Sequence, residues 1–338
     1  MRNARLLAVP AVLALAGCTA AAPDDAAPDG SAATGGEITA ERVLQVSEVH
    51  EATGMTLLEG PVFGPDGSLY VVDVVAPPGA GKVLRVDLED DSVETVHTDD
   101  AAVLTSAQFG PADGRLYVTD FVGGAIRSMT TDGTDVREVF SGPVDGVPMQ
   151  PDDIAFGPDG ALYVTDAAGA TAPYWEASGR VVRIDPATAE ATVLASDLPS
   201  PNGVGFSPDY DALWVSLNTG NRIDRLTLSP EGTEVATAHP AIVASAGIGQ
   251  VDSIAVDADG RLYVGLHNRP EILVYDTEGA LLTTVTVPEG EATGLASATN
   301  VAIEPGGTDA YATISGADGG FVYRFEALGE GIPQSNGG

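Results

Sequence analysis

A unit of about 48 residues occurs six times along this chain, and no other feature of the sequence constrains the fold as strongly. Each copy opens with a polar residue, which is followed four positions later by an apolar residue and eleven or twelve positions later by an aromatic one. We call the opening residues the slot residues: Glu59, Thr105, Asp152, Asn202, Asp252 and Thr299. A repeat of this length, made of short strands and Gly/Asp turns, is typical of a β-propeller with one blade per repeat.

The first copy indicates how one unit folds. We expect four strands in it, at residues 60–63, 68–74, 82–88 and 93–98. Apolar and polar residues alternate along 83–88, which suits an antiparallel sheet with one face packed on its neighbour. The turn at 64–67 reads Gly-Pro-Asp-Gly and recurs in similar form, with proline presetting φ and glycine accepting a positive φ. The sequence therefore predicts an all-β fold, a six-bladed β-propeller.

The sixth copy tests that prediction, because it has only three clear strands, at 300–304, 310–315 and 321–326. A ring that leaves a strand edge unpaired is open to aggregation, so the missing strand must come from elsewhere. Residues 43–49 are strand-like and precede the first copy. We therefore expect this N-terminal strand to close the propeller, whose domain spans residues 42–328, with a flexible C-terminal tail at 329–338.

Residues 1–17 read as an export signal. Arg2 and Arg5 precede an apolar run that ends in Leu15-Ala16-Gly17-Cys18, and this run is too short for a membrane-spanning helix. The ending is typical of a bacterial lipoprotein signal, in which Cys18 receives the lipid; an ordinary signal peptide that contains a cysteine is the alternative. Residues 18–41 are rich in Ala, Pro, Asp and Gly, which predicts a disordered tether. We thus expect an extracytoplasmic protein with a lipid anchor in the cell membrane.

Charge and cysteine content exclude some partners. The formal net charge is −34, and Lys82 is the only lysine. Nucleic acid needs clustered cations for its phosphates, so it is not an expected partner. Cys18 is the only cysteine, so the predicted domain has no disulfide. We interpret most of the negative charge as a solvated surface.

The slot residues are the candidate site. In a propeller the N-terminal ends of the innermost strands point into one mouth of the central channel. The slot residues are therefore predicted to converge there. Four of them are oxygen donors: Glu59, Asp152, Asn202 and Asp252. Such a set favours Ca²⁺ over zinc or copper, with another divalent cation as the alternative, and a cation would remove the repulsion between the carboxylates. Each residue alone could instead hydrogen-bond its own backbone at a turn.

The motifs around these slots resemble those of the SMP-30/gluconolactonase/LRE-like family. The similar stretches are Leu58-Glu59-Gly60-Pro61, Ser200-Pro201-Asn202-Gly203 and Val251-Asp252-Ser253, within a similarity that covers about residues 43–325. The resemblance is nearest to the family's calcium-dependent, drug-responsive lactonase branch. It implies a six-bladed propeller with a divalent metal in its channel, held at Glu59, Asp152, Asn202 and Asp252, with Ser253 beside them.

One departure from the family concerns a histidine that several members carry just before the last inner strand. This chain has Asn300 there. A mechanism that depends on that imidazole is therefore not expected here.

The resemblance leads to the hypothesis that the protein hydrolyses a small-molecule lactone. Ca²⁺ would bind the ester carbonyl and stabilise the oxyanion, while Asp252 takes a proton from the attacking water. Asp153 could orient Asp152, or it could only form a hydrogen bond at the start of the strand. The substrate pocket is expected to involve Tyr174 and Trp175 as an apolar wall, together with Asp153, Asn300 and His267. His267 could serve as an auxiliary base or be a solvent-exposed residue with no role.

Two other functions are compatible with the fold. The first is a non-catalytic extracytoplasmic lipoprotein that binds a protein or small ligand and has a structural calcium. The second is a quinone-dependent sugar dehydrogenase. That cofactor needs clustered Arg or Lys side chains near the axis, and the sequence shows no such cluster.

Overall fold

The part of the chain that the computed structural model describes, residues 35–167 and 177–334, is built from 25 β-strands and contains no helix. It follows that no helix in these residues is long and apolar enough to cross a membrane. Short alternating strands separated by Gly, Pro and Asp turns account for this architecture, because the apolar residues fall on alternate positions.

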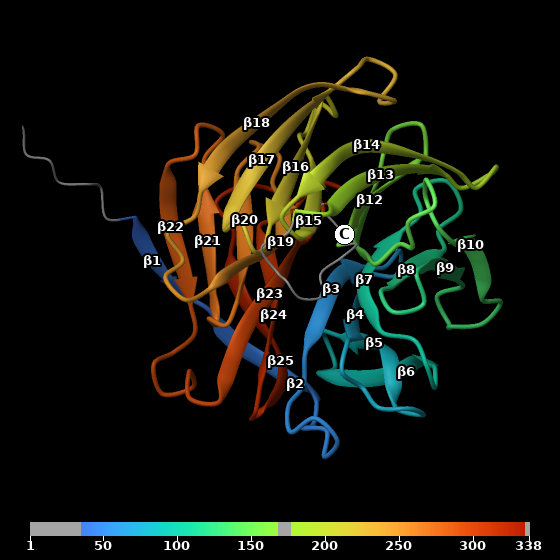
Figure 1. The fold of residues 1–338 in the computed structure, drawn as a ribbon. Helices are drawn as coiled ribbons and strands as arrows, with labels where there is room; N and C mark the ends of the chain where they lie inside the picture. The colour runs from blue at the N-terminus through green and yellow to red at the C-terminus, as the bar shows by residue number, and fades with distance from the viewer. Residues whose placement is uncertain (1–34, 168–176, 335–338) are drawn as a thin grey trace, which may run out of the picture. The chain divides into compact units, whose positions relative to one another are not determined.

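Four sheets have four antiparallel strands each (Figure 1). The first contains β3 (Leu58–Phe63), β4 (Leu69–Asp73), β5 (Gly81–Asp87) and β6 (Ser92–Thr98). The second contains β7 (Leu104–Phe109), β8 (Leu116–Asp120), β9 (Ala125–Met129) and β10 (Arg137–Ser141). The third contains β11 (Pro151–Phe156), β12 (Leu162–Asp166), β13 (Gly179–Asp185) and β14 (Glu190–Leu198). The fourth contains β15 (Pro201–Phe206), β16 (Ala212–Leu217), β17 (Arg222–Leu228) and β18 (Val235–Val243).

The remaining nine strands are connected as one sheet that consists of two groups. One group contains β19 (Gln250–Val256), β20 (Leu262–His267), β21 (Glu271–Tyr275), β22 (Leu281–Thr286) and β1 (Gly36–Thr39). The other contains β23 (Leu295–Ile303), β24 (Asp309–Gly316), β25 (Gly319–Glu326) and β2 (Glu41–Ser47). A single pairing, Leu266 with Ala298, joins the two groups, and buried apolar residues of both pack in one core cluster.

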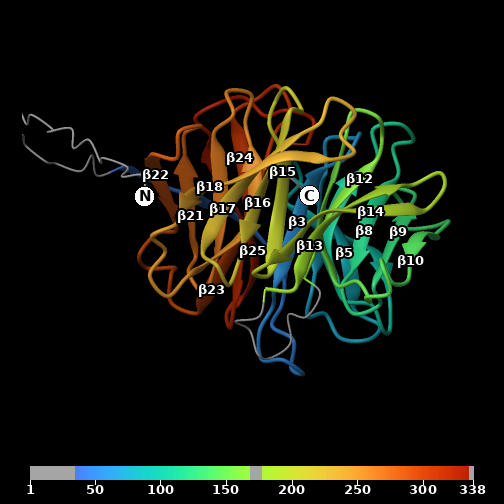
Figure 2. The ribbon, with the colours of Figure 1, turned by 45° about the horizontal axis from the view of Figure 1, so that its top comes forward.

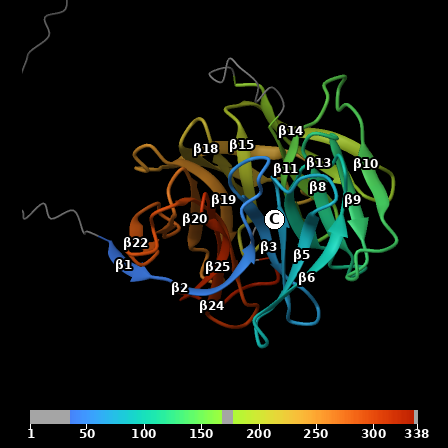
Figure 3. The ribbon, with the colours of Figure 1, turned by 90° about the horizontal axis from the view of Figure 1, so that it is seen from below.

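The N-terminal strands pair with the last two groups. β2 covers most of the strand predicted at 43–49, and it runs antiparallel to β25 (Figure 3). β1 runs parallel to β22, an arrangement that the sequence did not predict. The predicted tether, 18–41, is therefore too long at its C-terminal end, because 36–39 is a paired strand. The four residues Gly-Glu-Ile-Thr carry too little apolar alternation to be recognised as a strand without their partner.

The first strands of the six groups lie beside one another in chain order, and β23 also contacts β3. Strands β3 and β15 lie near the middle, while β10 and β22 lie at opposite outer edges (Figure 2). Tyr70 packs edge to face on Phe109 of the next group, with ring centroids 5.1 Å apart. Phe63 and Tyr311 make the same kind of contact between the first and last groups at 5.7 Å. The two apolar positions of the repeat are thus explained by packing between neighbouring groups.

The repeated turns fit against these aromatic rings. A Cβ atom on Gly64 would lie 2.6 Å from the ring of Tyr70, and one on Gly157 would lie 2.7 Å from the ring of Tyr163. Glycine opens these turns because the ring of the following strand occupies the space of a side chain. Gly67 closes the first turn at a φ of 82°, which only glycine adopts without strain.

The C-terminal segment, which we define as residues 327–334, contacts the body. Gly331 forms β-bridges with Asp257 and Pro305. The Gln334 side chain accepts a hydrogen bond from the Phe156 amide at 2.6 Å and donates one to the Phe156 carbonyl at 3.0 Å. The prediction of a flexible tail is therefore wrong for 329–334. Backbone hydrogen bonds hold this Gly-rich stretch, and they leave no pattern in the side chains.

Candidate functional site

A cavity of about 390 Å³ opens at the ends of the inner strands where the slot residues lie. We call it the mouth site. Its lining includes all four predicted oxygen donors, together with a threonine slot residue and one histidine: Glu59, Asp152, Asn202, Asp252, Thr105 and His267. The three carboxylates are almost fully buried, with 6%, 8% and 2% of Glu59, Asp152 and Asp252 exposed. The structure therefore brings together in one cavity groups that come from four different inner strands.

A bulge in each inner strand accounts for this convergence. The register of pairing shifts between Glu59 and Val62, and it shifts at the corresponding place in the other inner strands. Such bulges redirect side chains away from the plane of the sheet. The residue that follows two of the slots is glycine, and a Cβ on Gly203 would lie 2.7 Å from the backbone of Ser253. The strands thus approach too closely at this level for any side chain.

The two threonine slots have structural roles. The Thr105 hydroxyl lies within hydrogen-bond distance of the Asp152 carbonyl, at 3.2 Å, and Thr299 donates to the Leu58 carbonyl at 2.6 Å. Each threonine therefore ties its own strand to the strand of the next group. Thr105 also holds the backbone of an acidic slot residue in place.

The acidic groups of the mouth site form a partly satisfied network. The Asn202 amide donates to Asp152 Oδ2 at 3.1 Å. Asn202 Oδ1 and Asp252 Oδ2 are buried and have no hydrogen-bond partner. His267 Nδ1 lies 3.8 Å from Asp252 Oδ2. Buried acceptors without donors are rare in folded proteins, so these two oxygens mark a place for a ligand.

The pKa values of the carboxyl groups reflect the same imbalance. Burial raises the pKa of Glu59 well above its usual range, and the neighbouring Asp252 and Asp152 raise it further. Burial, and after it the charge of Asp152, also raise the pKa of Asp252. The pKa of Asp152 rises to about 7 by burial, although hydrogen bonds from Thr105 and Asn202 oppose the rise. Burial and mutual repulsion therefore favour the protonated forms of these carboxyl groups, and a bound cation would favour the charged forms.

The donor set fits a hard divalent cation. Within residues 35–167 and 177–334, no three His, Cys, Asp or Glu side chains are arranged as a ready-made metal site. Even so, the two buried oxygens without partners and the mutual repulsion of the carboxylates are the features that a cation would satisfy. All four donors are oxygens, which suits Ca²⁺. Small movements of the carboxylates would be needed to bring them onto one ion.

Three predicted residues do not line the mouth site. Asp153 is buried, with 1% exposed, and its pKa is raised well above the usual range by burial and then by Asp152. The Ser253 hydroxyl lies near Asp153, since it lowers the pKa of that carboxyl against the effect of burial. The Asn300 side chain accepts a hydrogen bond from the Val301 amide at 2.7 Å. These residues lie one position beyond the slots and form a layer below the cavity.

The remaining predicted site residues are His267, Tyr174, Trp175 and Cys18. His267 lines the cavity, with about a third of its side chain exposed, and burial lowers its pKa. The imidazole is thus neutral at pH 7, and its Nδ1 lies 3.3 Å from the Ser297 hydroxyl. Tyr174, Trp175 and the predicted lipidation site Cys18 lie outside the described residues.

Sequence reasoning missed two polar residues that line the cavity, Ser200 and Gln250, whereas Asn218, which also lines it, begins a loop that was expected on this side. Ser200 and Gln250 stand two positions before a slot residue, so the repeat itself contained the signal. Asn218 follows the second strand of its group, and its side chain donates to the Val251 carbonyl at 2.9 Å. This hydrogen bond fixes the backbone of β19 at the residue before Asp252.

Comparisons with known proteins identify the family of the chain. A sequence profile described as the SMP-30/Gluconolactonase/LRE-like region matches residues 57–303. The chain is 28% identical over 306 residues to lactonase drp35 of Staphylococcus saprophyticus, covering 87% of this chain and 89% of the relative.

Solved structures resemble the fold. The calcium-binding protein regucalcin of Agrobacterium tumefaciens superposes with a TM-score of 0.69 at 16% identity, over 89% of this chain and 99% of that one. A gluconolactonase of Xanthomonas campestris superposes with a TM-score of 0.66 at 22% identity, over 85% and 97%. These likenesses confirm an all-β, propeller-like fold.

Proposed function

The chain belongs to the SMP-30/gluconolactonase/LRE-like family, and from that premise we propose that it is a calcium-dependent lactonase. One observation carries the proposal. Three buried carboxylates and an amide from four inner strands share one cavity, and two of their oxygens have no partner. Relatives named lactonase and gluconolactonase support hydrolysis of a lactone as the reaction. They favour an enzyme over the non-catalytic binding protein that the sequence left as an alternative.

The architecture behind the proposal is a six-bladed propeller closed by β2. Three observations support it: β23 contacts β3, Phe63 packs on Tyr311, and β2 pairs with β25 as the outermost strand of the last group. In such a ring the mouth site lies at one end of the central channel. Substrate would then enter from the side on which Phe121, Ala167 and Asn218 follow the second strands.

Glu59, Asp152, Asn202 and Asp252 are the residues that would hold the cation. When bound, Ca²⁺ supplies an electrophile that polarises the ester carbonyl and favours the charge developing on its oxygen. Ser253, which the resemblance implies beside the ligands, is not among the lining residues, and its hydroxyl lies near Asp153.

The chain's own groups carry the proton transfers. Asp252 Oδ2, which has no hydrogen-bond partner, accepts the proton of the attacking water. The water oxygen adds to the carbonyl carbon, the ring C–O bond breaks, and the departing alkoxide takes up the proton that Asp252 received, so the product is a hydroxy acid. Neutral His267, at 3.8 Å from the same oxygen, can hydrogen-bond the water or the departing alkoxide. Asn202 holds Asp152 through its amide, so that the carboxylate stays directed into the cavity.

Localisation follows from the sequence alone. We propose that Cys18 is lipidated and anchors the protein outside the cytoplasm, with the start of the chain serving as the signal. Globomycin treatment of expressing cells would test it. Accumulation of an unprocessed precursor is expected, and normal processing of a Cys18→Ser variant at the same position would contradict lipidation.

The experiment for the activity is hydrolysis of a simple aromatic lactone by the wild type and by Asp252→Asn, with and without chelator. We expect turnover that chelator abolishes and calcium restores, and a loss of 10²-fold or more in Asp252→Asn, which is a typical contribution of a general base. Glu304→Gln, a carboxylate change at the opposite ends of the inner strands, is the matched control. Calcium binding without hydrolysis of any lactone would refute the enzyme.

A further inference from the structure

A second and larger cavity, of about 710 Å³, lies at the other ends of the same inner strands. We call it the far cavity. Glu59, near the start of β3, lines the mouth site, and Phe63, at the last position of that strand, lines the far cavity. In the same way Thr299 lies toward the mouth site, and Ile303 ends β23 at the far cavity. The two cavities therefore occupy opposite ends of one bundle of strands, and the proposed lactonase activity does not use the far one.

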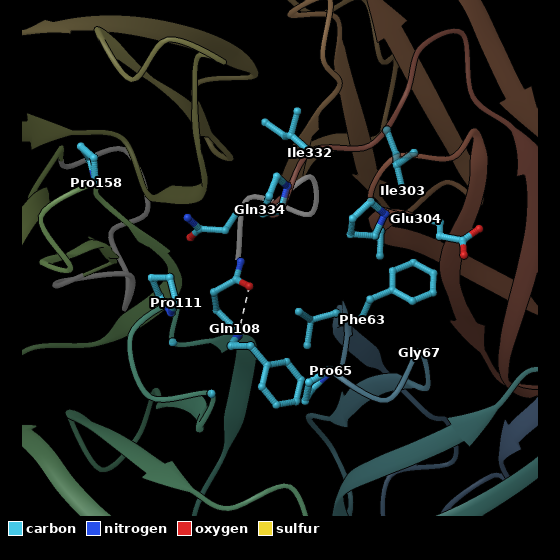
Figure 4. Close-up of a pocket in the computed structure, with 18 of the residues that line it drawn as sticks. Phe63, Pro65, Gly67, Gln108, Pro111, Pro158, Ile303, Glu304, Ile332 and Gln334 are labelled. Atoms are coloured by element: carbon cyan, nitrogen blue, oxygen red, sulfur yellow. Dashed lines mark hydrogen bonds between the residues drawn. The ribbon is translucent and has the colours of Figure 1, made fainter.

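The walls of the far cavity are held in place by packing. Pro65, Pro111 and Pro158 come from the turns that follow three inner strands, and they stand around the opening with Phe63 and Ile303 (Figure 4). These turns are fixed because the glycine before each proline sits directly against a tyrosine ring of the following strand. A preformed cavity of this kind loses little entropy when it binds a ligand.

The C-terminal segment supplies another wall. Ile332 and Gln334 line the far cavity, and Figure 4 shows them across the opening from Phe63 and Gln108. The two hydrogen bonds between Gln334 and the backbone of Phe156 fix the end of this segment to β11. The cavity is therefore completed by a stretch of chain that takes no part in any of the sheets.

Charge selects the kind of ligand. The lining residues include no lysine, arginine or histidine, and their one carboxylate, Glu304, is exposed at the edge. The formal net charge of the chain is −34, so an anion would be repelled and would find no cation. The hydroxy acids that a lactonase releases are anions and are excluded on this ground. The buried side chain of Gln108 is the main polar group in the floor, and its Oε1 accepts from the Phe109 amide at 3.1 Å.

We propose that the far cavity is a second ligand site, which binds an uncharged, ring-bearing apolar molecule. The volume lies in the range of cavities that hold small molecules, and the lining of proline, phenylalanine and isoleucine side chains suits flat apolar rings. The ligand is not the lactone substrate, because it occupies the opposite ends of the strands from the carboxylates.

The test is a fluorescence titration of the full chain with N-phenyl-1-naphthylamine, a neutral probe with two ring systems. Saturable binding of one probe per chain is expected. Ile332→Asp, which places a carboxylate in the wall, is expected to weaken binding at least tenfold. Ile248→Asp is the matched control, since Ile248 is 84% exposed and lies outside the lining; it is expected to bind like the wild type.

A second variant distinguishes a change in the cavity from unfolding of the protein. Pro111→Asp changes an exposed position of the lining. It is expected to weaken binding of the probe as Ile332→Asp does and to leave the melting temperature unchanged. No saturable binding by the wild type, equal binding by both lining variants and the control, or displacement of the probe by a lactone would overturn the proposal. These outcomes are independent of lactone hydrolysis, so failure of the lactonase proposal would leave this one standing.

Discussion

The side-chain amide of Asn202 donates a hydrogen bond to Asp152 Oδ2 at 3.1 Å, between the innermost strands of two neighbouring sheets. This contact places an amide and a carboxylate side by side in the mouth site. It also leaves Asn202 Oδ1 buried without a partner, so the same side chain orients one proposed ligand oxygen and offers another. The site is thus assembled by groups that support one another across sheet boundaries.

Replacing Asn202 by alanine tests that relationship. The change removes one donor oxygen and the hydrogen bond that lowers the pKa of Asp152. We expect calcium affinity to fall about tenfold or more, in line with the loss of a hydrogen bond to a charged group. Isothermal titration calorimetry measures it, with exposed Asn268→Ala as the control. Equal affinities for the two variants would rule Asn202 out as a ligand.

Without calcium, stability is expected to fall as the pH rises through neutrality. The pKa of Asp152 is about 7 in the folded chain and near 4 when unfolded, so between these values the folded state binds more protons. The stability that this proton contributes is complete below pH 4 and is lost as the pH rises through 7. Glu59 and Asp252 shift in the same direction.

Calcium should reverse this trend, because it binds the deprotonated groups. Urea denaturation between pH 5 and 8, with chelator and with excess calcium, measures both effects. If calcium stabilised the protein equally at pH 5 and pH 8, the carboxyl groups of the mouth site would not be its ligands. An exposed carboxylate variant such as Asp209→Asn is the control and should leave both curves unchanged.

Phe63→Ala is expected to destabilise the protein by about 3 kcal/mol, the lower end for loss of a buried phenylalanine, because Phe63 is only partly buried. The ring packs on Tyr311 and joins the first group of strands to the last. Phe206→Ala, which breaks the contact with Tyr163 between two middle groups, is the comparison. Equilibrium unfolding in urea measures both variants. A cost below 1 kcal/mol for Phe63→Ala alone would argue against a closed ring.

Gln334→Ala is expected to cost about 1–2 kcal/mol, since it removes two hydrogen bonds between the C-terminal segment and β11. Gln334→Glu keeps an acceptor for the Phe156 amide but sets a charged oxygen against the Phe156 carbonyl, so its cost should be at least as large. Hydrogen exchange of the Phe156 amide gives the direct readout. Unchanged protection of that amide in Gln334→Ala would show that the segment is not held in this way.

Much of the fold was predictable because side chains encode it locally. The repeated spacing of Glu59, Phe63 and Tyr70 marks where a strand starts, where it packs on its neighbour and where the next strand lies. The same spacing identified the slot residues that line the mouth site. A period of this kind is visible in the sequence because each copy must satisfy the same packing.

Tertiary structure decided what depends on the backbone. The bulges that turn the slot side chains into the channel, the parallel pairing of β1 with β22 and the docking of Gly331 are made by N–H and C=O groups, which every residue shares. The repeat spacing had already separated the slot residue Asp152 from Asp153, but it could not show why adjacent carboxyl groups differ. The bulge of β11 supplies the physical reason, because it turns Asp152 into the cavity and leaves Asp153 buried outside its lining.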